Sequence, residues 1–339
     1  MSYQCLENQQ VKKTDSILVI QTASIGDVIL ATPVVEKLHR YFPDSRIDLL
    51  VKKGNESLFT GHPFLHEVLI WDKRSHANRN FIRLLHHVRT MKYSLVVNLQ
   101  RFFKTGLMTA LSGAELTIGF DKNPMSLFFT KKVSHKLDGV HEINRNLALL
   151  EDITDNSGAM PRLYPSLIDF EHVASMKTSL FYTVSPASLW FTKQYPVEKW
   201  VEFAAQFPAD ANIYLLGAGN DYSLCEKIIE EVALPGIKNL AGQLTFLQSA
   251  ALMKDARMNF TNDSAPMHLA SAVNAPVTAV YCSTVPGFGF GPLSDDSWVV
   301  EVDNKLSCRP CGLHGYKSCP EKHFRCAFDI RTGQLTERL

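Results

Sequence analysis

The sequence predicts an α/β protein built from two Rossmann-like domains that face each other across a cleft. Along nearly the whole chain of 339 residues, short apolar runs typical of strands alternate with amphipathic stretches typical of helices. The alternation comes in two consecutive series, separated by a stretch at 157–165 that holds two prolines and a glycine. Strands that alternate with helices fold into parallel sheets covered by helices, so each series predicts one doubly wound domain. We expect these domains at residues 1–160 and 161–339.

The first series begins with a strand, a turn of small polar residues and a helix. Residues 16–21 form an apolar run typical of a buried parallel strand, and residues 22–27 form the turn. Apolar residues then recur at helical spacing from Val28 to Leu38, with Pro33 early in the helix. Further strands are expected at 47–51, 67–71 and 94–99, and further helices at 81–91, 105–111 and 142–152.

The second series leads to a run of polar residues that opens a helix. Strands are expected at 180–184, 212–216 and 277–281, and helices at 197–207, 222–232 and 247–256; residues 258–260 lead into the polar run. In the run 261–270, Asp263 and Ser264 are good N-caps and Pro266 suits a first helical turn. Helix starts attract phosphate oxygens, because their backbone N–H groups are unpaired and the dipole is positive there. The same run also fits an ordinary capped helix.

Composition and charge are those of a water-soluble enzyme. Hydrophobic residues make up 45% of the chain and charged residues 20%, and the formal net charge is +1. Residues 1–15 show no apolar signal core, and no apolar run is long enough to span a bilayer, so we expect a cytoplasmic protein.

The charge is unevenly spread along the chain. Between residues 52 and 136 there are fourteen Lys or Arg and five acids. This window is either a solvated basic face or a surface for an acidic acceptor and an anionic membrane. Nucleic acid is not expected, because no recognised binding motif accompanies the charge.

Five short motifs, in this order and spacing, resemble the heptosyltransferases of glycosyltransferase family 9. They occupy residues 22–28, 98–104, 141–146, 193–196 and 261–270, and the resemblance extends from about residue 16 to residue 330. It implies the GT-B architecture, in which two Rossmann-like domains enclose the nucleotide sugar. It also implies an inverting transfer of heptose from ADP-heptose to an acidic acceptor in the inner core of lipopolysaccharide.

Glycosyl transfer needs a base for the acceptor hydroxyl and positive potential for the leaving diphosphate. The resemblance gives the role of base to Asp27, which could also be a helix residue that only compensates the dipole. The chain has no Asp-x-Asp motif to hold a divalent metal. We therefore expect Lys193 and the helix start at 262–266 to balance the charge of the diphosphate. Taken alone, Lys193 would be an ordinary surface lysine.

The resemblance implies a donor site in the cleft and an acceptor site on the N-terminal side. The implied donor-binding residues are Gly26, Lys193, Leu244, Thr245, Asn262, Asp263, Ser264, Met267 and His268. Of these, His268 could instead be a buried structural histidine. The implied acceptor-binding residues are Ser24, Arg101 and Lys104. Two positions depart from the family pattern: Asn98 replaces a commoner Asp, and Arg101 a commoner Gly. These departures concern the identity of the acceptor.

The C-terminal region contains a cluster of four cysteines, Cys308, Cys311, Cys319 and Cys326. Thiolates at this density suit a structural zinc ion, although the spacing of the second pair is long. Free or pairing thiols are the alternative. No cofactor is expected for transfer itself. The resemblance links this segment, 308–326, to a cysteine-rich tail in part of the family.

Three other functions remain open from the sequence. The enzyme could use another nucleotide sugar, or the chain could be a non-catalytic module that binds nucleotide or lipopolysaccharide. Residues 217–221 follow an expected strand and resemble a dinucleotide turn, which would suit an NAD-dependent dehydrogenase, but the third glycine of that fingerprint is missing. If the acceptor is lipid-linked, peripheral contact with the inner leaflet of the inner membrane is expected.

Overall fold

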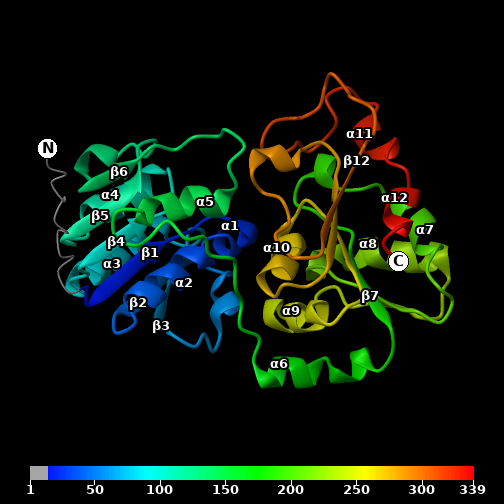
Figure 1. The fold of residues 1–339 in the computed structure, drawn as a ribbon, viewed down its shortest axis with the longest axis horizontal. Helices are drawn as coiled ribbons and strands as arrows, with labels where there is room; N and C mark the ends of the chain where they lie inside the picture. The colour runs from blue at the N-terminus through cyan, green and yellow to red at the C-terminus, as the bar shows by residue number, and fades with distance from the viewer. Residues whose placement is uncertain (1–13) are drawn as a thin grey trace, which may run out of the picture.

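Over residues 14–339, which the computed structural model describes, the chain forms two parallel six-stranded sheets. The N-terminal sheet has the order β3-β2-β1-β4-β5-β6, and the C-terminal sheet has the order β12-β11-β10-β7-β8-β9. Counted along its own half of the chain, each sheet has the Rossmann order 3-2-1-4-5-6. Figure 1 shows the two halves side by side, with helices on the faces of each sheet. The prediction about a signal sequence lies outside the described residues, apart from positions 14 and 15.

The N-terminal half holds the first sheet and the helices around it. Its strands are β1 (Ser16–Ile20), β2 (Arg46–Lys52), β3 (Leu65–Trp71), β4 (Leu95–Asn98), β5 (Leu116–Phe120) and β6 (Lys131–Val133). Its α-helices are α1 (Ile25–Ile29), α2 (Thr32–Tyr41), α3 (Ala77–Thr90), α4 (Phe103–Ala110) and α5 (Glu142–Leu147). Its 3₁₀ turns are η1 (Glu56–Phe59), η2 (Ser126–Phe128) and η3 (Ala148–Leu150).

The C-terminal half repeats the arrangement. Its strands are β7 (Phe181–Ser185), β8 (Asn212–Leu215), β9 (Ile237–Asn239), β10 (Asn259–Asn262), β11 (Val277–Tyr281) and β12 (Ser297–Glu301). Its α-helices are α6 (Leu167–His172), α7 (Val197–Ala204), α8 (Tyr222–Val232), α9 (Phe246–Lys254), α10 (Ala265–Ala272), α11 (Arg325–Phe328) and α12 (Gly333–Thr336). Its 3₁₀ turns are η4 (Ala174–Lys177), η5 (Phe191–Lys193), η6 (Gly219–Asp221) and η7 (Pro286–Phe288).

The central strands of both sheets are buried along their whole length. Every residue of β1, β4, β7, β10 and β11 is buried, as expected for parallel strands covered by helices on both faces. The edge strands β6 and β12 are only partly buried. Because β6 and β12 are partly exposed, their sequences lack a long apolar run, and neither strand was predicted. The strands β5 and β9 were not predicted either.

Two predicted helices are interrupted. The helix expected from Val28 to Leu38 is divided, because α1 ends at Ile29 and α2 begins at Thr32. Pro33 lies in the first turn of α2, where its missing N–H costs nothing, but it cannot continue a helix from α1. The helix expected at 142–152 keeps α-helical geometry only through α5, and the chain then tightens into the 3₁₀ turn η3.

An irregular stretch between η3 and α6 joins the two halves. Its start is fixed to α2, because the ammonium of the buried Lys37 lies 3.0 Å from Asp155 and donates a hydrogen bond to the carbonyl of Ser157. Beyond it, α6 contacts α9 of the C-terminal half. The predicted division at residue 160 falls within this stretch, and the acceptor and donor roles of the two halves stay predictions. Of the helices within residues 14–339, none combines the length and the apolar character needed to cross a bilayer.

Candidate active site

The predicted site residues follow the strands where each sheet changes direction. In the N-terminal sheet this point lies between β1 and β4, and in the C-terminal sheet between β7 and β10. Asp27 follows β1, Lys104 follows β4, Lys193 follows β7 and Asp263 follows β10. Open α/β sheets bind ligands at the carboxyl ends of these strands, because the flanking loops diverge there. Each half therefore offers one such ligand-binding edge.

Asp27 lies in the first turn of α1 and caps that helix. The backbone N–H of Ser24 donates to Oδ2 of Asp27 at 3.1 Å, and the Ser24 hydroxyl donates to the same oxygen. The carboxylate is partly buried. Capping occupies Oδ2, and this position therefore fits both predicted roles of Asp27, the structural one and the catalytic one.

The two halves meet where α1 contacts α10, at Gly26 and His268. A Cβ atom on Gly26 would lie 2.9 Å from Cδ2 of His268, so the close packing of these helices needs a glycine here. Burial lowers the pKa of His268 to about 4, so the imidazole is neutral at neutral pH. Charges on Asp263 and Asp27 oppose that shift, and the charge on Lys193 adds to it. The charges of Asp27, Lys193 and Asp263 thus all act on His268, whose Nδ1 has no hydrogen-bond partner among the described residues.

A nearly buried ion pair joins Lys193 and Asp263 on the C-terminal side. Nζ of Lys193 lies 2.7 Å from Oδ2 of Asp263, and the two side chains are 15% and 8% exposed. The hydroxyl of Thr284 donates to the same carboxylate oxygen at 2.6 Å. Lys193 is thus a positioned cation beside the start of α10, where a diphosphate could replace Asp263 as its partner.

The segment that carries Lys193 is held from both sides. The side-chain amide of Asn262 accepts from the N–H of Tyr195 at 2.9 Å and donates to the carbonyl of Pro186 at 2.8 Å. Next to Lys193, the hydroxyl of Thr192 accepts from the N–H of Tyr316, in the cysteine-rich tail, at 2.7 Å. Asn262 and the tail therefore position Lys193, since the oxygen and the nitrogen of the Asn262 amide are both engaged.

The other predicted donor residues differ in how accessible they are. Ser264 is the partly buried N-cap residue of α10. Met267 is fully buried and contacts the hydroxyl of Tyr281, 3.5 Å from its sulfur. Leu244 packs against the core, and the hydroxyl of the exposed Thr245 caps α9 by accepting from the N–H of Gln248 at 3.1 Å. Ser264 is thus partly accessible at the start of α10, and Met267 lies in the core.

A pocket of about 290 Å³ lies beside the turn that carries Asp27. Its lining residues are Trp71, Lys73, Ala77, Gln100, Phe102, Phe103, Lys104 and Thr105. Nζ of Lys73 donates to the carbonyl and to the hydroxyl of Thr22, each at 2.8 Å, and lies 4.7 Å from the centre of the Trp71 ring. Burial lowers the pKa of Lys73 to about 8, and the charges of Lys52 and Lys104 add to this effect. Of the predicted acceptor residues, Lys104 lines the pocket, and the exposed Ser24 and Arg101 do not.

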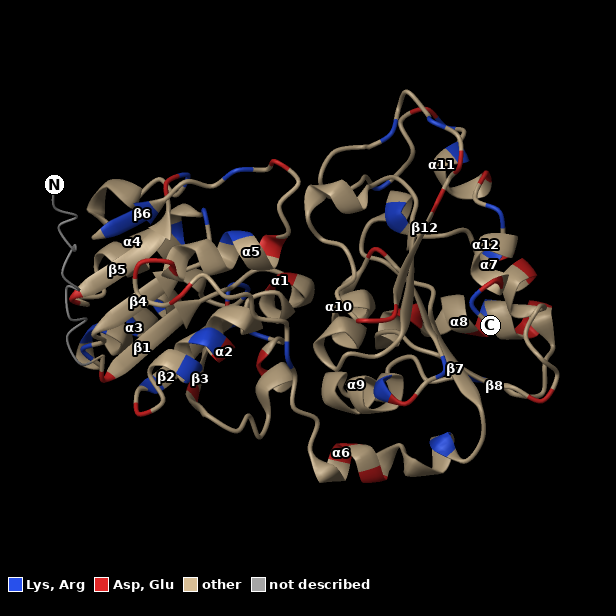
Figure 2. Ribbon diagram, in the orientation of Figure 1, with Lys and Arg blue, Asp and Glu red and all other residues tan. Residues whose placement is uncertain are grey.

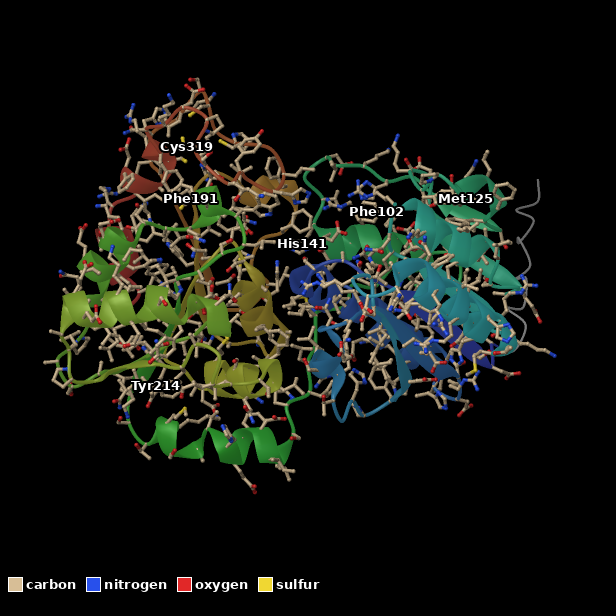
Figure 3. The ribbon with its side chains drawn as sticks, turned by 180° about the vertical axis from the view of Figure 1, so that it is seen from behind. Phe102, Met125, His141, Phe191, Tyr214 and Cys319 are labelled. Carbon is tan, nitrogen blue, oxygen red and sulfur yellow. The ribbon has the colours of Figure 1, made fainter. Side chains whose placement is uncertain are left out.

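Sequence reasoning assigned no role to Lys73, Glu142 or Arg145. Glu142 and Arg145 form an ion pair of 2.7 Å at the start of α5, and the N–H of Glu142 donates to the carbonyl of Gly289 in the C-terminal half at 2.7 Å. Burial raises the pKa of Glu142, Arg145 opposes this, and the charge of Asp27 adds to it. Figure 3 shows the neighbouring His141 where the two halves meet. For Glu142 and Arg145, the motif at 141–146 was the signal in the sequence that could have indicated a role.

The four cysteines gather in the tail without forming a closed site. Zinc bound by four thiolates needs sulfur atoms about 3.8 Å apart, given Zn–S bonds of about 2.3 Å. Within residues 14–339, the one group of three or more potential ligand atoms within 4.8 Å of one another is Asp48, His66 and Glu67. Sγ of Cys308 lies 3.9 Å from Nε2 of His323. The chemistry of the donors suits zinc, but their spacing is too wide, so the zinc ion stays a prediction.

The turn at 217–221 does not lie at the switch point of its sheet, where a dinucleotide would bind. It follows β8, whereas the C-terminal sheet changes direction between β7 and β10. The carboxylate of Asp221 accepts from the N–H of Ala218 at 2.8 Å, which closes the turn on itself. The structure therefore favours a local turn over an NAD site.

The chain is similar to known proteins of one family. The model of glycosyltransferase family 9 (heptosyltransferase) matches residues 81–319. Lipopolysaccharide heptosyltransferase 3 of Escherichia coli is 26% identical over 277 residues, which are 76% of this chain and 81% of that protein. Lipopolysaccharide heptosyltransferase 1 of Pseudomonas aeruginosa is 24% identical over 336 residues, which are 94% of this chain and 92% of that protein.

A solved structure shows the same fold. The E. coli ADP-heptose lipopolysaccharide heptosyltransferase II, at 22% identity, aligns with 95% of this chain and 97% of its own with a TM-score of 0.77. This likeness confirms the predicted GT-B architecture of two Rossmann-like halves. The family inferred from the five motifs is confirmed as well: the chain belongs to glycosyltransferase family 9, the heptosyltransferase family, and is a glycosyltransferase.

Proposed function

We propose that this enzyme transfers a heptose from ADP-heptose to an acidic sugar of the lipopolysaccharide inner core, with inversion at the anomeric carbon. One observation carries the proposal: α1, which holds Asp27, packs at Gly26 against His268 of α10, and α10 begins directly after the Lys193–Asp263 pair. A base and an anion-binding cation on opposite sides of a cleft suit a single displacement. The names of the relatives supply heptose, ADP and lipopolysaccharide.

In the proposed reaction, the acceptor hydroxyl attacks the anomeric carbon of the heptose as Asp27 removes its proton. The new bond forms between the acceptor oxygen and that carbon, and the bond from the carbon to the diphosphate oxygen breaks. ADP leaves with the electron pair of the broken bond. Lys193 and the N-terminus of α10 stabilise the developing charge on the diphosphate. For this step Lys193 exchanges its bond to Asp263 for one to a phosphate oxygen.

The proposed acceptor site is the pocket next to Thr22, in the turn that leads to Asp27. Lys73 and Lys104 give it positive charge, and Trp71 and Phe103 give it apolar walls against which a sugar ring can pack. Arg101 and Ser24, which are exposed and do not line the pocket, complete the predicted acceptor set. This combination suits a sugar that carries a carboxylate or phosphate.

A panel of sugar nucleotides tests the proposal. Purified enzyme is assayed for release of nucleoside diphosphate from ADP-heptose, ADP-glucose and UDP-glucose, with and without a deacylated lipopolysaccharide core as acceptor. We expect acceptor-dependent release of ADP from ADP-heptose alone. Turnover of another donor would favour the alternative family 9 transferase, and binding without turnover would favour a non-catalytic module.

Lys73 predicts a pH dependence of acceptor binding. Because its pKa is lowered to about 8, its ammonium is charged below that pH and neutral above it. We expect the acceptor KM to rise about tenfold from about pH 7 to about pH 9.5, since a charged hydrogen bond contributes about 1.5–3 kcal/mol. The variant Lys73→Arg stays charged over this range and should show no such rise. A flat wild-type profile, or the same rise in the variant, would contradict this role. The exposed Lys53 offers the control Lys53→Arg, which should behave as wild type.

Metal removal separates the diphosphate site from the cysteine cluster. We expect transfer to persist in excess chelator, because Lys193 replaces the divalent metal at the diphosphate. If the tail closes on a zinc ion, elemental analysis for zinc and iron should find about one zinc per chain; iron is measured too, because thiolates also bind iron. The double variant Cys308→Ser/Cys311→Ser should lose this zinc. Activity that is lost in chelator and restored by Mg²⁺ or Mn²⁺ would show that a metal serves the diphosphate.

A further inference from the structure

Large apolar side chains are exposed on the surface formed by α4 and η2. Leu127 and Phe128 of η2 are 81% and 67% exposed, and η2 packs on α4. At the two ends of α4, Phe102, Phe103 and Leu111 are exposed as well. We call these five residues the α4–η2 patch. Single exposed apolar residues are common on proteins, whereas several on two elements that contact each other suit an interaction surface.

Local structure explains why η2 points its apolar residues outward. The side chain of Asn123 accepts from the N–H of Met125 and donates to the carbonyl of Gln100, both at 2.9 Å, and so fixes the chain that enters η2. Phe129 takes the inward position, against Gly119, where an added Cβ would lie 2.6 Å from its ring. Leu127 and Phe128 are therefore held outside by a well-ordered turn.

Positive charge surrounds the patch. Residues 101–136 contain six Lys or Arg and two acids, a net charge of +4. Arg101, Lys104, Lys122 and Lys132 are exposed, and Asp121, one of the two acids, accepts from the N–H of His135 at 2.9 Å. Figure 2 shows Lys and Arg on β6 and on the connection that follows it. Two such faces would repel each other, so the charge argues against a second copy of this chain as the partner.

We propose that the α4–η2 patch docks this enzyme on an anionic lipid bilayer. Aromatic and aliphatic side chains enter the boundary between headgroups and acyl chains, and flanking Lys and Arg bind the anionic headgroups. Phe102 and Phe103 also line the pocket proposed for the acceptor, so docking would bring that pocket to the membrane surface. Figure 3 shows Phe102 on the side of the N-terminal half near the C-terminal half, with Met125 farther out along the same side. The statement that docking serves a lipid-linked acceptor rests on the proposed function. The statement that the protein binds an anionic bilayer rests on the α4–η2 patch and its charge alone.

Vesicle binding by surface variants tests the proposal. The full-length protein is sedimented with vesicles of phosphatidylethanolamine and phosphatidylglycerol, and with vesicles of phosphatidylcholine alone. The test variant is Leu127→Ser/Phe128→Ser, whose residues lie outside the pocket lining. The matched control is Leu167→Ser/Ile168→Ser on α6, where the side chains are similarly exposed at 80% and 74%. Turnover of a water-soluble deacylated acceptor is measured in parallel.

We expect wild-type protein to bind the anionic vesicles and to be released by high salt. Leu127→Ser/Phe128→Ser should weaken this binding at least about tenfold, since burying each such side chain contributes substantially, and should leave turnover of the soluble acceptor unchanged. The α6 variant should bind as wild type. Equal binding by the two double variants, equal binding to neutral vesicles, or a dimer that the η2 variant dissociates would overturn the proposal. Absence of transfer with intact vesicle binding would overturn the proposed function instead.

Discussion

Replacing Asp27 by Asn lowers kcat by about 10²–10⁴-fold, the usual contribution of a general base. The amide oxygen of Asn can still accept the hydrogen bonds that Ser24 donates to Oδ2, so the cap of α1 persists. Asn cannot take a proton from the acceptor hydroxyl. Binding of ADP should therefore stay close to that of wild type. Steady-state kinetics with ADP-heptose and a deacylated acceptor measure the first effect, and calorimetric titration with ADP measures the second.

The chain offers a matched control for this change on α6. Asp169 caps α6 as Asp27 caps α1: the N–H and the hydroxyl of Ser166 donate to its Oδ2 at 2.8 and 2.7 Å. Asp169→Asn makes the same capping change far from the site and should leave kcat unaltered. Asp27→Ala removes both cap and base. If either Asp27 variant kept more than about a tenth of the wild-type rate, the substitution would have raised the activation free energy by less than about 1.4 kcal/mol. Asp27 would then not be the base.

The sequence could place the candidate site at the switch points because its residues follow the strands there within a few positions. Asp27, Lys193 and Asp263 each come within eight residues of a buried strand end, and local patterns mark such strands well. Parallel strands bring their carboxyl ends to one edge, so strand order alone collects these residues. The residues of the proposed acceptor pocket are different. Lys73 follows the edge strand β3, and only the pairing of that strand brings it to Thr22, at the end of β1.

Contacts between the halves could not be predicted from local sequence. Glu142 and Arg145 meet the C-terminal half through the backbone around Gly289, which follows a different strand far along the chain. Likewise, the cysteine-rich tail predicted a metal site, but nothing local indicated that Tyr316 would hold Thr192 beside Lys193. Such contacts depend on tertiary packing, which side-chain periodicity does not describe.

Replacing Lys193 by Ala is the second change with a large expected effect. The ammonium lies 2.7 Å from Asp263 and, in the proposed reaction, binds the diphosphate instead. Hydrogen bonds to charged groups contribute about 1.5–3 kcal/mol, so kcat/KM for the donor should fall about 10- to 150-fold and ADP should bind more weakly. The loss should be larger for the transition state than for the bound donor, because the charge on the diphosphate grows as the bond breaks. A fall in kcat as well as a rise in the donor KM would show this.

Lys177 provides the matched control for Lys193. Its ammonium pairs with Asp255 at 2.5 Å and its side chain is also 15% exposed, whereas Asp255 is 49% exposed and Asp263 only 8%. Lys177→Ala therefore removes a Lys–Asp ion pair from the same half, with a more exposed partner. That variant should lose some thermal stability and keep wild-type kinetics. Lys193→Ala also leaves Asp263 nearly buried without its cation, and the double variant Lys193→Ala/Asp263→Asn removes that extra cost. If the double variant recovered wild-type kcat/KM, the defect of Lys193→Ala would come from the unpaired carboxylate, and Lys193 would have no role at the diphosphate.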